Sequence, residues 1–428
     1  MPSHSRVNMA STYVVHYAEV ALKGKNRPDF VRVLRKNLAR ALSGLHPEIR
    51  HAEGRLLVTA EGTSDEVAAR ISATFGVAWF SPVTVVESDV LKIRTAVLEM
   101  AKGSTGRTFK IDARRSDKSF PVRSHELAGD LGAAVAEQSG MKVDLTDPDV
   151  VFHVDVTKTR TTVYSKKQAG PGGLPVGTAG RVMLLFSGGI DSPVAAWLMM
   201  KRGCVPVYVH FYLAPSPLTA LESKIVRLVK VLSSYGGKCT LVLVPFAEYQ
   251  LATTGEADEL EPSLFRRFMR MTCEALAPWF GASAISTGDS LSQAASQTLW
   301  NIGAFDQGST LPVLRPLLTF DKEEIISLAR AVSTYDLSLE DYKDCCAIIT
   351  RHPKTRVKAE QISEAVSRIG LDKLVWNVIE RATLVSYNPS TGELKSGPLG
   401  EAMRRPGRVV PEPVPSPLPG ASRPPTPS

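Results

Sequence analysis

A run of small polar residues, Ser187-Gly-Gly-Ile-Asp-Ser192, stands between an apolar, strand-like run and a helical stretch. Its first three residues lack bulk, so their backbone N–H groups can converge on a phosphate where the helix begins. Ser192 is expected to cap that helix, and Pro193 suits its first position. The sequence therefore predicts an anion-binding loop, with a simple strand-to-helix turn as the alternative without chemistry.

Asp191 lies inside this turn, where its negative charge would repel a phosphate directly. Its carboxylate is better suited to holding a magnesium ion or to orienting the loop through backbone hydrogen bonds, and both roles stay open. Other phosphate-binding motifs fit poorly, because residues 172–177 lack a Walker A lysine and no G-x-G-x-x-G follows a strand. An ordinary P-loop kinase and a dinucleotide dehydrogenase are therefore disfavoured.

The five cysteines are odd in number and unevenly spaced, which argues against a secreted disulfide framework. Cys204, Cys239 and Cys273 fall in apolar strand or helix patterns, where a free thiol usually behaves as a small buried hydrophobe. Two pairs of C-x-x-C, as a structural zinc site needs, are absent, so no metal site is certain. The adjacent Cys345 and Cys346 remain as candidates for chemistry.

The elements that would position these residues fall into regions that differ in how strand-like and helix-like segments alternate. A run rich in glycine and proline lies before the last of these regions. That run is not expected to form a regular element. The predicted organisation is a flexible N-terminus at 1–11, a small α/β module at 12–61, an α+β module at 62–167, a linker at 168–181, a catalytic domain at 182–404 and a disordered proline-rich tail at 405–428.

The region after the linker alternates apolar, β-prone runs with helical stretches. Its candidate strands are Val182–Phe186, Val205–Tyr212, Thr240–Val244 and Ala282–Ser286. This rhythm predicts a doubly wound parallel sheet, which binds its ligand outside the carboxyl ends of the strands. The loop at 187–192 would then lie at that edge.

The composition is that of a globular chain, with 43% hydrophobic and 22% charged residues among 428. A formal charge of +8 favours a polyanionic partner. The sequence has no run of roughly 18 apolar residues and no apolar core of a signal peptide near its start. We therefore expect a cytoplasmic protein without a membrane partner.

Five segments together resemble one known family: Tyr17–Arg27, Ser187–Ser192, Ser286–Thr298, Leu314–Leu317 with Asp321–Ile325, and Asp344–Cys346. With them the chain is identified as a member of the ThiI family, the tRNA sulfurtransferases that make 4-thiouridine. The resemblance runs from about Thr12 to Gly400. It implies a multidomain α/β and α+β protein with a ferredoxin-like N-terminal domain, a THUMP domain for RNA and a Rossmann-like, pyrophosphatase-loop adenylating domain.

The resemblance also implies a reaction, in which ATP adenylates O4 of uridine 8 in tRNA and a persulfide sulfur then displaces AMP. Magnesium is expected with the ATP. The implied nucleotide contacts are Leu184, Leu185, Ser187, Gly188, Gly189, Asp191, Ser192, Val209, His210, Arg266, Gly288 and Gln297. Lys322 is a weaker candidate for stabilising charge. A satisfied core histidine at 210 and an exposed basic helix face at 266 are the alternatives.

Cys345 aligns with the persulfide-bearing cysteine of the family, and Cys346 beside it stays an alternative. The reactive form is the thiolate, so Cys345 is expected to be accessible and near the positive charge of Lys343, Arg351 and Lys354. A cysteine desulfurase would load it. Some members end in a rhodanese domain, and here only the proline-rich tail follows Arg405, which leaves the resolving thiol open.

RNA is expected to bind the first two modules through phosphate contacts. The basic and polar residues that the sequence offers there are Lys23, Lys25, Asn26 and Arg27, and then Arg107, Lys110, Arg114, Arg115, Lys118 and Arg123. The family further implies a homodimer and, for thiamin thiazole synthesis, a ThiS-like sulfur carrier, a role that the missing rhodanese domain puts in question. An adenylating synthetase for a small molecule and a noncatalytic RNA-binding protein are the alternative functions.

Overall fold

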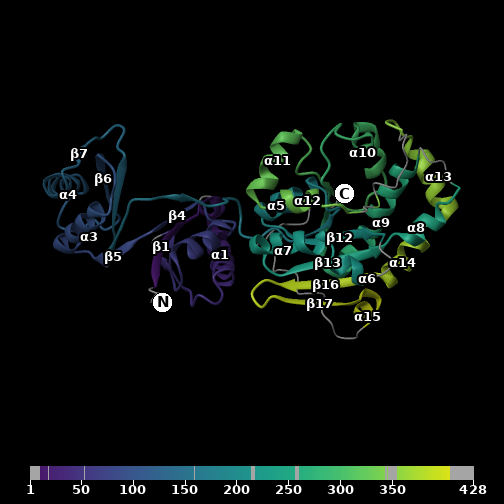
Figure 1. The fold of residues 1–428 in the computed structure, drawn as a ribbon, viewed down its shortest axis with the longest axis horizontal. Coiled ribbons are helices and arrows are strands. Elements are labelled where there is room, and N and C mark those ends of the chain that lie inside the picture. Colours follow the sequence, from purple (N-terminus) through teal and green to yellow (C-terminus); the bar gives the residue numbers. More distant parts are fainter. Residues whose placement is uncertain are drawn as a thin grey trace, which may run out of the picture. The chain divides into compact units, whose positions relative to one another are not determined.

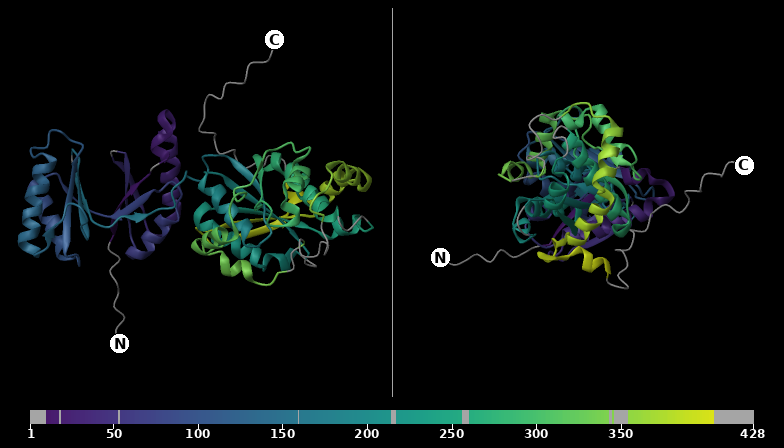
Figure 2. Two further views of the ribbon diagram at one scale, coloured as in Figure 1. Left: turned by 90° about the horizontal axis from the view of Figure 1, so that it is seen from above. Right: turned by 90° about the vertical axis from the view of Figure 1, so that its right-hand side faces the viewer.

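The computed structural model describes residues 10–17, 19–52, 54–158, 160–213, 217–255, 260–342, 345 and 354–404. They form two compact units. The first comprises the described residues up to Leu22 and those of Leu38–Gly172, and the second comprises Lys23–Asn37 and the described residues from Gly173 onward. Figures 1 and 2 show the elements of both units in the colours of the sequence.

The first unit begins with an antiparallel sheet in the order β10-β4-β1-β3-β2. Its strands are β1 Ser11–His16, β2 Glu48–Ala52, β3 Arg55–Ala60, β4 Trp79–Pro82 and β10 Gln168–Ala169, and the helices of this part of the sequence are η1 Glu19–Asn26, α1 Arg27–Ala41 and α2 Ser64–Ser72. Thr63 caps α2 by accepting a hydrogen bond from the N–H of Glu66. The predicted boundary at residue 61 falls before α2 and β4, although β4 pairs with β1 in this sheet.

A second sheet in the same unit has the order β5-β9-β8-β6-β7. Its strands are β5 Thr84–Glu87, β6 Thr108–Arg115, β7 Lys142–Val143, β8 Val150–Val156 and β9 Arg160–Tyr164, and its helices are α3 Val90–Lys102 and α4 Ser124–Ser139. Apolar side chains of both helices pack with Phe109 and Phe152 of the sheet into one core. This burial of a helix face against a sheet face holds the module together.

The two sheets of the first unit are connected twice. Only Val83 separates β4 from β5, and three residues separate β9 from β10. Arg55 forms an ion pair with Asp155, whose carboxylate also accepts a hydrogen bond from the hydroxyl of Tyr164 at 3.1 Å. Because Arg55 lies in the first sheet and Asp155 in the second, this partly buried pair ties the sheets to each other.

The second unit contains a seven-stranded sheet in the order β15-β14-β11-β12-β13-β16-β17. Its strands are β11 Arg181–Leu185, β12 Val205–Tyr212, β13 Cys239–Pro245, β14 Ala282–Ser286, β15 Val313–Leu314, β16 Thr383–Asn388 and β17 Glu393–Pro398. The first five pair in parallel, which confirms the doubly wound prediction. The hairpin β16–β17 adds two antiparallel strands at one edge that the sequence did not indicate.

Helices cover both faces of this sheet (Figure 1). One face carries α5 Asp191–Lys201 and α7 Lys224–Gly236, with α11 Lys322–Ala331 and α12 Tyr335–Leu339 packed on them. The other carries α9 Glu261–Phe280 and α14 Leu371–Arg381, with α8 Ala247–Ala252, α10 Leu299–Asp306 and α13 Ala359–Ile369 outside. The remaining short helices are α6 Pro217–Leu221, η3 Ala295–Gln297 and α15 Leu399–Arg404. The strand order reverses at β11, where a doubly wound sheet opens its ligand crevice.

The predicted linker at 168–181 is more ordered than its glycine content indicated. Residues 168 and 169 form β10, and Leu174 donates its N–H to the carbonyl of Lys201 at 2.9 Å. A Cβ at Gly173 would lie 2.2 Å from that carbonyl oxygen, so only glycine allows this approach. The predicted tail, 405–428, lies outside the described residues.

Candidate active site

A cavity of about 410 Å³ opens at the carboxyl ends of β11, β12 and β14. Its lining comes from the last residues of β11 and β12, from the turns after β11 and β14, from α9, from the stretch leading into α10 and from α10 itself, together with Cys345. The lining residues are Leu185, Phe186, Ser187, Asp191, Ser192, Val209, His210, Phe211, Pro262, Phe265, Arg266, Met269, Thr287, Gly288, Asp289, Ala294, Ala295, Ser296, Gln297, Phe305 and Cys345. The cavity therefore lies at the sheet edge that the sequence predicted.

The loop at 187–192 is a compact turn held by its own side chains. The hydroxyl of Ser192 accepts a hydrogen bond from the N–H of Gly188 at 3.3 Å. Gly188 has φ +81°, and a Cβ there would meet Cδ1 of Ile225 at 2.3 Å. Since both the conformation and the space exclude a side chain, this position requires glycine.

The prediction that Ser192 caps the following helix is wrong. Helix α5 begins at Asp191, and its N-cap residue, Ile190, makes no side-chain capping bond. Ser192 lies inside the first turn and closes the loop backwards onto Gly188. Pro193 also lies in the first turn. The N–H groups of that turn have no partner within the helix, so proline, which has no N–H, costs no helical hydrogen bond there.

Gly288 follows β14 and lies against the loop. A Cβ at this position would approach the backbone nitrogen of Ser192 to 3.1 Å and the carbonyl carbon of Asp191 to 3.2 Å. Glycine here therefore lets the turn after β14 pack directly on the start of α5. Gly288, which the resemblance implied as a nucleotide contact, thus makes its close approach to the protein backbone.

The carboxylate of Asp191 is held by two side chains from distant segments. Its Oδ1 accepts a hydrogen bond from Nζ of Lys322 at 2.7 Å, and its Oδ2 accepts one from Nε2 of Gln293 at 3.0 Å. The side chain of Asp191 nevertheless keeps 22% of its accessible surface. Asp191 and Lys322, two predicted catalytic residues, are therefore brought together, although Lys322 does not line the cavity itself.

Arg266 is not an exposed basic face but the centre of a buried ion-pair network. Its two terminal nitrogens donate to the two carboxylate oxygens of Asp289 at 3.0 and 2.7 Å, and its guanidinium stacks 4.8 Å from the ring centre of Phe305. Arg315 also donates to Asp289 and forms a second pair with Asp306. Burial alone would raise the pKa of Asp289, but Arg266 and, less strongly, Arg315 hold it below its ordinary value.

His210 is a buried histidine whose two ring nitrogens are both bonded. The carbonyl of Phe186 lies 2.7 Å from Nδ1 and can only accept, so Nδ1 carries the proton and Nε2 accepts from the hydroxyl of Tyr342 at 2.8 Å. Burial lowers the pKa of His210 to about 4. The hydrogen bond to the carbonyl of Phe186 opposes this shift, and the positive charge of Lys224 adds to it. It is therefore a neutral, satisfied side chain that nevertheless lines the cavity.

Cys345 lies in the same cavity as the loop, yet it is not accessible as predicted. Only 1% of its surface is exposed, and its Sγ donates a hydrogen bond to the carbonyl of Phe211 at 3.2 Å. Cys346, Lys343 and Arg351 lie outside the described residues. Cys204, Cys239 and Cys273 are buried as expected, and burial raises the pKa of Cys204 and Cys273.

Asn301 anchors the chain that follows the cysteine segment. Its Nδ2 donates to the carbonyls of Ala295, at 2.7 Å, and Lys354, at 2.9 Å, while its Oδ1 accepts from the N–H of Val357. Thr298 adds a bond from its hydroxyl to the carbonyl of Thr355 at 2.7 Å. The first turn of α10 therefore holds the stretch at 354–357 beside residues that line the cavity.

Ten predicted site residues meet in this cavity: Leu185, Ser187, Asp191, Ser192, Val209, His210, Arg266, Gly288, Gln297 and Cys345. Leu184, Gly188 and Gly189 support it without lining it. The sequence analysis missed Asp289, Arg315 and Asn301. The first two lie within segments that it had singled out, but which side chain pairs with which could not be inferred from their order.

The predicted RNA-binding residues form two groups, one in each unit. Lys23, Lys25, Asn26 and Arg27 lie where η1 meets α1, with Lys23 over the ring of Phe30. In the first unit Arg107, Arg114, Lys118 and Arg123 are exposed, whereas Lys110 and Arg115 are half-buried. Arg115 donates to the carbonyls of Phe120 and Val122 and so also holds the turn after β6.

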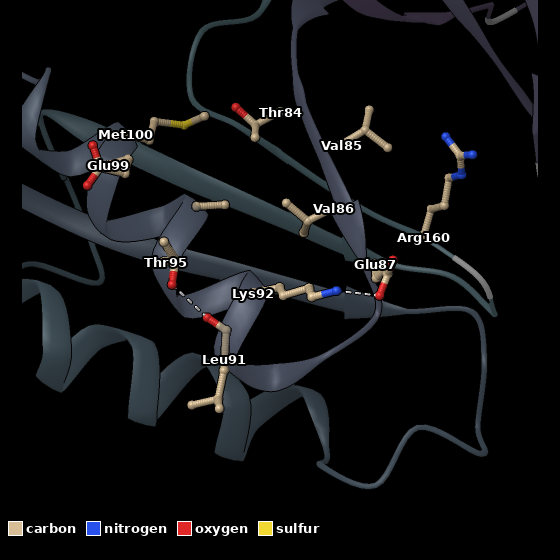
Figure 3. Close-up of a pocket in the computed structure, with 11 residues that line it drawn as sticks. Thr84, Val85, Val86, Glu87, Leu91, Lys92, Thr95, Glu99, Met100 and Arg160 are labelled. Carbon is tan, nitrogen blue, oxygen red and sulfur yellow. Dashed lines mark hydrogen bonds and ion pairs between the residues drawn. The ribbon is translucent and has the colours of Figure 1, made fainter.

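A larger groove, of about 1040 Å³, lies between β5, β9 and α3 in the first unit (Figure 3). Lys92 pairs with Glu87 and Glu99 pairs with Lys102, so these charged side chains are engaged locally. Nothing in its lining resembles an assembled reaction centre. Over the described ranges, no three metal-ligating side chains gather, and no helix there is long and apolar enough to cross a membrane.

Comparison with known families agrees with this division of the chain. The model of the "Thiamine biosynthesis protein (ThiI)" family matches residues 177–371, the ThiI ferredoxin-like domain matches residues 12–81, and the THUMP domain matches residues 87–166. These matches confirm the ferredoxin-like domain, the THUMP domain and the pyrophosphatase-loop domain of the ThiI family expected from the sequence. The ferredoxin-like match reaches past residue 61, as does the pairing of β4.

Individual relatives cover most of the chain. A probable tRNA sulfurtransferase of Moorella thermoacetica is 39% identical over 89% of this chain and 99% of its own length. One from Geobacillus kaustophilus is 38% identical over 89% of this chain and 96% of its own length. Among solved structures, a 4-thiouridine synthetase in complex with RNA and bound ATP has a TM-score of 0.78 at 31% identity, covering 88% of this chain and 100% of that one.

Proposed function

The chain belongs to the ThiI family, and we propose from this membership that it is a tRNA sulfurtransferase that converts uridine 8 of tRNA to 4-thiouridine with ATP. The observation that carries the proposal is the presence of Cys345 in the same cavity as Ser187 and Asp191. A loop suited to phosphate and a thiol in one cavity supply the two parts that an adenylation followed by sulfur transfer needs.

The first half-reaction is adenylation of the base. The 4-oxygen of uridine attacks the α-phosphorus of ATP, a P–O bond forms, and pyrophosphate leaves. The N–H groups of the loop and the start of α5 favour the phosphates, and Lys322 adds positive charge beside Asp191. The partly exposed carboxylate of Asp191 is the group that would hold magnesium, which neutralises phosphate charge when bound.

The second half-reaction transfers sulfur from a persulfide on Cys345. The terminal sulfur attacks C4 of the adenylated base, the C–S bond forms, and AMP leaves with the former 4-oxygen. A thiol then attacks Sγ of Cys345, which breaks the S–S bond, releases 4-thiouridine and leaves a disulfide between that thiol and Cys345. The donor that loads the persulfide would be a cysteine desulfurase.

RNA would be held by the THUMP and ferredoxin-like domains, and the exposed basic side chains there support this role. The solved 4-thiouridine synthetase that resembles this chain is itself a complex with RNA and ATP. The description of the matching family as a thiamine biosynthesis protein keeps sulfur delivery to a ThiS-like carrier as a second candidate function.

The test is formation of 4-thiouridine in an unmodified tRNA transcript by the purified protein with ATP, magnesium, cysteine and a cysteine desulfurase. We expect thiolated tRNA from the wild type. Asp191→Ala should lose at least about a hundredfold in adenylation and product alike, since it removes the carboxylate that would hold magnesium at the reacting phosphates and that positions Lys322.

Two results would contradict the proposal. Release of pyrophosphate at the same rate without tRNA would favour an adenylating synthetase for a small molecule. Binding of tRNA without any ATP consumption would favour a noncatalytic RNA-binding protein.

A further inference from the structure

Two large apolar residues stand exposed at the start of α10. Leu299 and Trp300 keep 70% and 59% of their surface accessible. Only Thr298 separates them from η3, whose residues Ala295–Gln297 line the cavity. An apolar pair exposed next to a reaction site is a feature that marks interaction surfaces.

The indole of Trp300 is covered on one side by a cation. The guanidinium carbon of Arg356 lies 3.9 Å from the centre of the Trp300 ring system. Arg356 is itself exposed, and no carboxylate within the described ranges forms an ion pair with it. We call these two side chains the Trp300–Arg356 pair. It presents a flat surface and an uncompensated positive charge.

The pair is fixed in place by the backbone beneath it. Thr298 caps α10 and also donates to the carbonyl of Thr355, the residue before Arg356. Asn301, the residue after Trp300, bonds to Lys354 and Val357 on either side. Both members of the pair therefore stand on segments cross-linked by hydrogen bonds, so little conformational entropy remains to be lost when a ligand stacks on them.

A planar aromatic ring beside a guanidinium is the chemistry that recognises an unpaired nucleobase with its phosphate. Bases stack on tryptophan and on guanidinium planes irrespective of sequence, and the arginine charge attracts the backbone. A protein partner would need a wider apolar area than Leu299 and Trp300 offer. The surface therefore fits an unstacked base of the RNA better than a protein.

We propose that the Trp300–Arg356 pair is a stacking platform for a base of tRNA that neighbours the reacting uridine, and that it holds the strand at the mouth of the cavity. This inference rests on the proposed function, because it assumes that RNA is the substrate. It assigns Trp300 and Arg356 a role in positioning the substrate, apart from the reacting groups.

The experiment compares Trp300→Ala, Trp300→Phe and Trp300→Leu with Trp376→Ala. Trp376 is a matched control, because it is 53% exposed in the same unit but lies on α14 and lines a different cavity. We measure kcat/KM for unmodified tRNA, KM for ATP, and equilibrium binding of the same tRNA without ATP. Trp300→Ala should lower kcat/KM for tRNA and weaken binding by about tenfold, with KM for ATP unchanged.

The substituents separate stacking from simple apolar contact. Trp300→Phe should recover most of the loss and Trp300→Leu should not, while Trp376→Ala stays at the wild-type value. Equal losses for Trp300→Ala and Trp376→Ala, or full activity of Trp300→Leu, would overturn the platform. If the wild type makes no 4-thiouridine yet Trp300→Ala still weakens tRNA binding, the proposed function fails and the platform stands.

Discussion

The cavity of the second unit has two sides that are built in different ways. The loop side consists of Ser187–Ser192 with Gly288, and it is shaped by backbone contacts that only glycine permits. The cysteine side consists of Cys345 with Tyr342 and Lys354, which flank it in the sequence and are held by side chains from elsewhere. In the proposed mechanism, adenylation would therefore depend on a preformed loop, and sulfur transfer would depend on how the cysteine segment is anchored.

Gly188→Ala should break the loop side with the largest effect. It places a methyl group 2.3 Å from Cδ1 of the buried Ile225 and forces a side chain into a left-handed conformation, so either the loop or Ile225 must shift. We expect adenylation to fall about a hundredfold, because misplacement of reacting groups costs that much. The measurement is tRNA-dependent release of pyrophosphate, with the melting temperature recorded in parallel. A variant that stays folded and adenylates at the wild-type rate would contradict a preformed loop.

Asn301→Ala should weaken the cysteine side more than the loop side. It removes the bonds to Lys354 and Val357 and one to the cavity-lining Ala295, and it leaves the contacts within Ser187–Ser192 in place. We predict a fall of about tenfold in 4-thiouridine formation, with adenylation within about twofold of wild type. Asn301→Asp, which keeps the acceptor for the N–H of Val357, should lose less. Equal losses in both half-reactions would show that the two sides are not separable.

His210 contacts both sides, since it bonds to Phe186 before the loop and to Tyr342 before the cysteine. Its pKa in the folded protein is about 4, below the ordinary 6.5, so the folded state binds fewer protons than the unfolded state between these values. Stability is therefore full above pH 6.5 and is lost as the pH falls, by about 3 kcal/mol at most below pH 4.

Chemical denaturation at pH 7 and pH 5 measures this loss. His210→Gln, which can still donate to the carbonyl of Phe186, should show a smaller difference between the two pH values. An unchanged difference would mean that other groups cause the acid sensitivity.

The sequence predicted the loop side better than the cysteine side. Glycine, serine and strand patterns are local, so Ser187–Ser192 and its place at the end of β11 could be inferred from neighbouring residues. The partners of Arg266 and His210 lie 23 and 132 residues away, in Asp289 and Tyr342, and no local pattern indicates such pairs. The burial of Cys345 escaped prediction for the same reason, because strand β12 supplies the carbonyl that it contacts.

The fold shows the same division. The parallel strands of the second unit follow their apolar runs closely, whereas the pairing of β4 with β1 and of β16 with β13 joins segments far apart in the chain. Which strand pairs with β4 or β16 is set by tertiary packing, and a local pattern of apolar residues does not indicate it.

The most direct test of the two-sided cavity is to follow both half-reactions in Cys345→Ser with unmodified tRNA, ATP, magnesium and a loaded cysteine desulfurase. We predict tRNA-dependent pyrophosphate release near the wild-type rate and a loss of roughly three orders of magnitude or more in 4-thiouridine, as removal of a nucleophile produces. Full formation of 4-thiouridine by Cys345→Ser would show that another thiol carries the sulfur and would contradict the account.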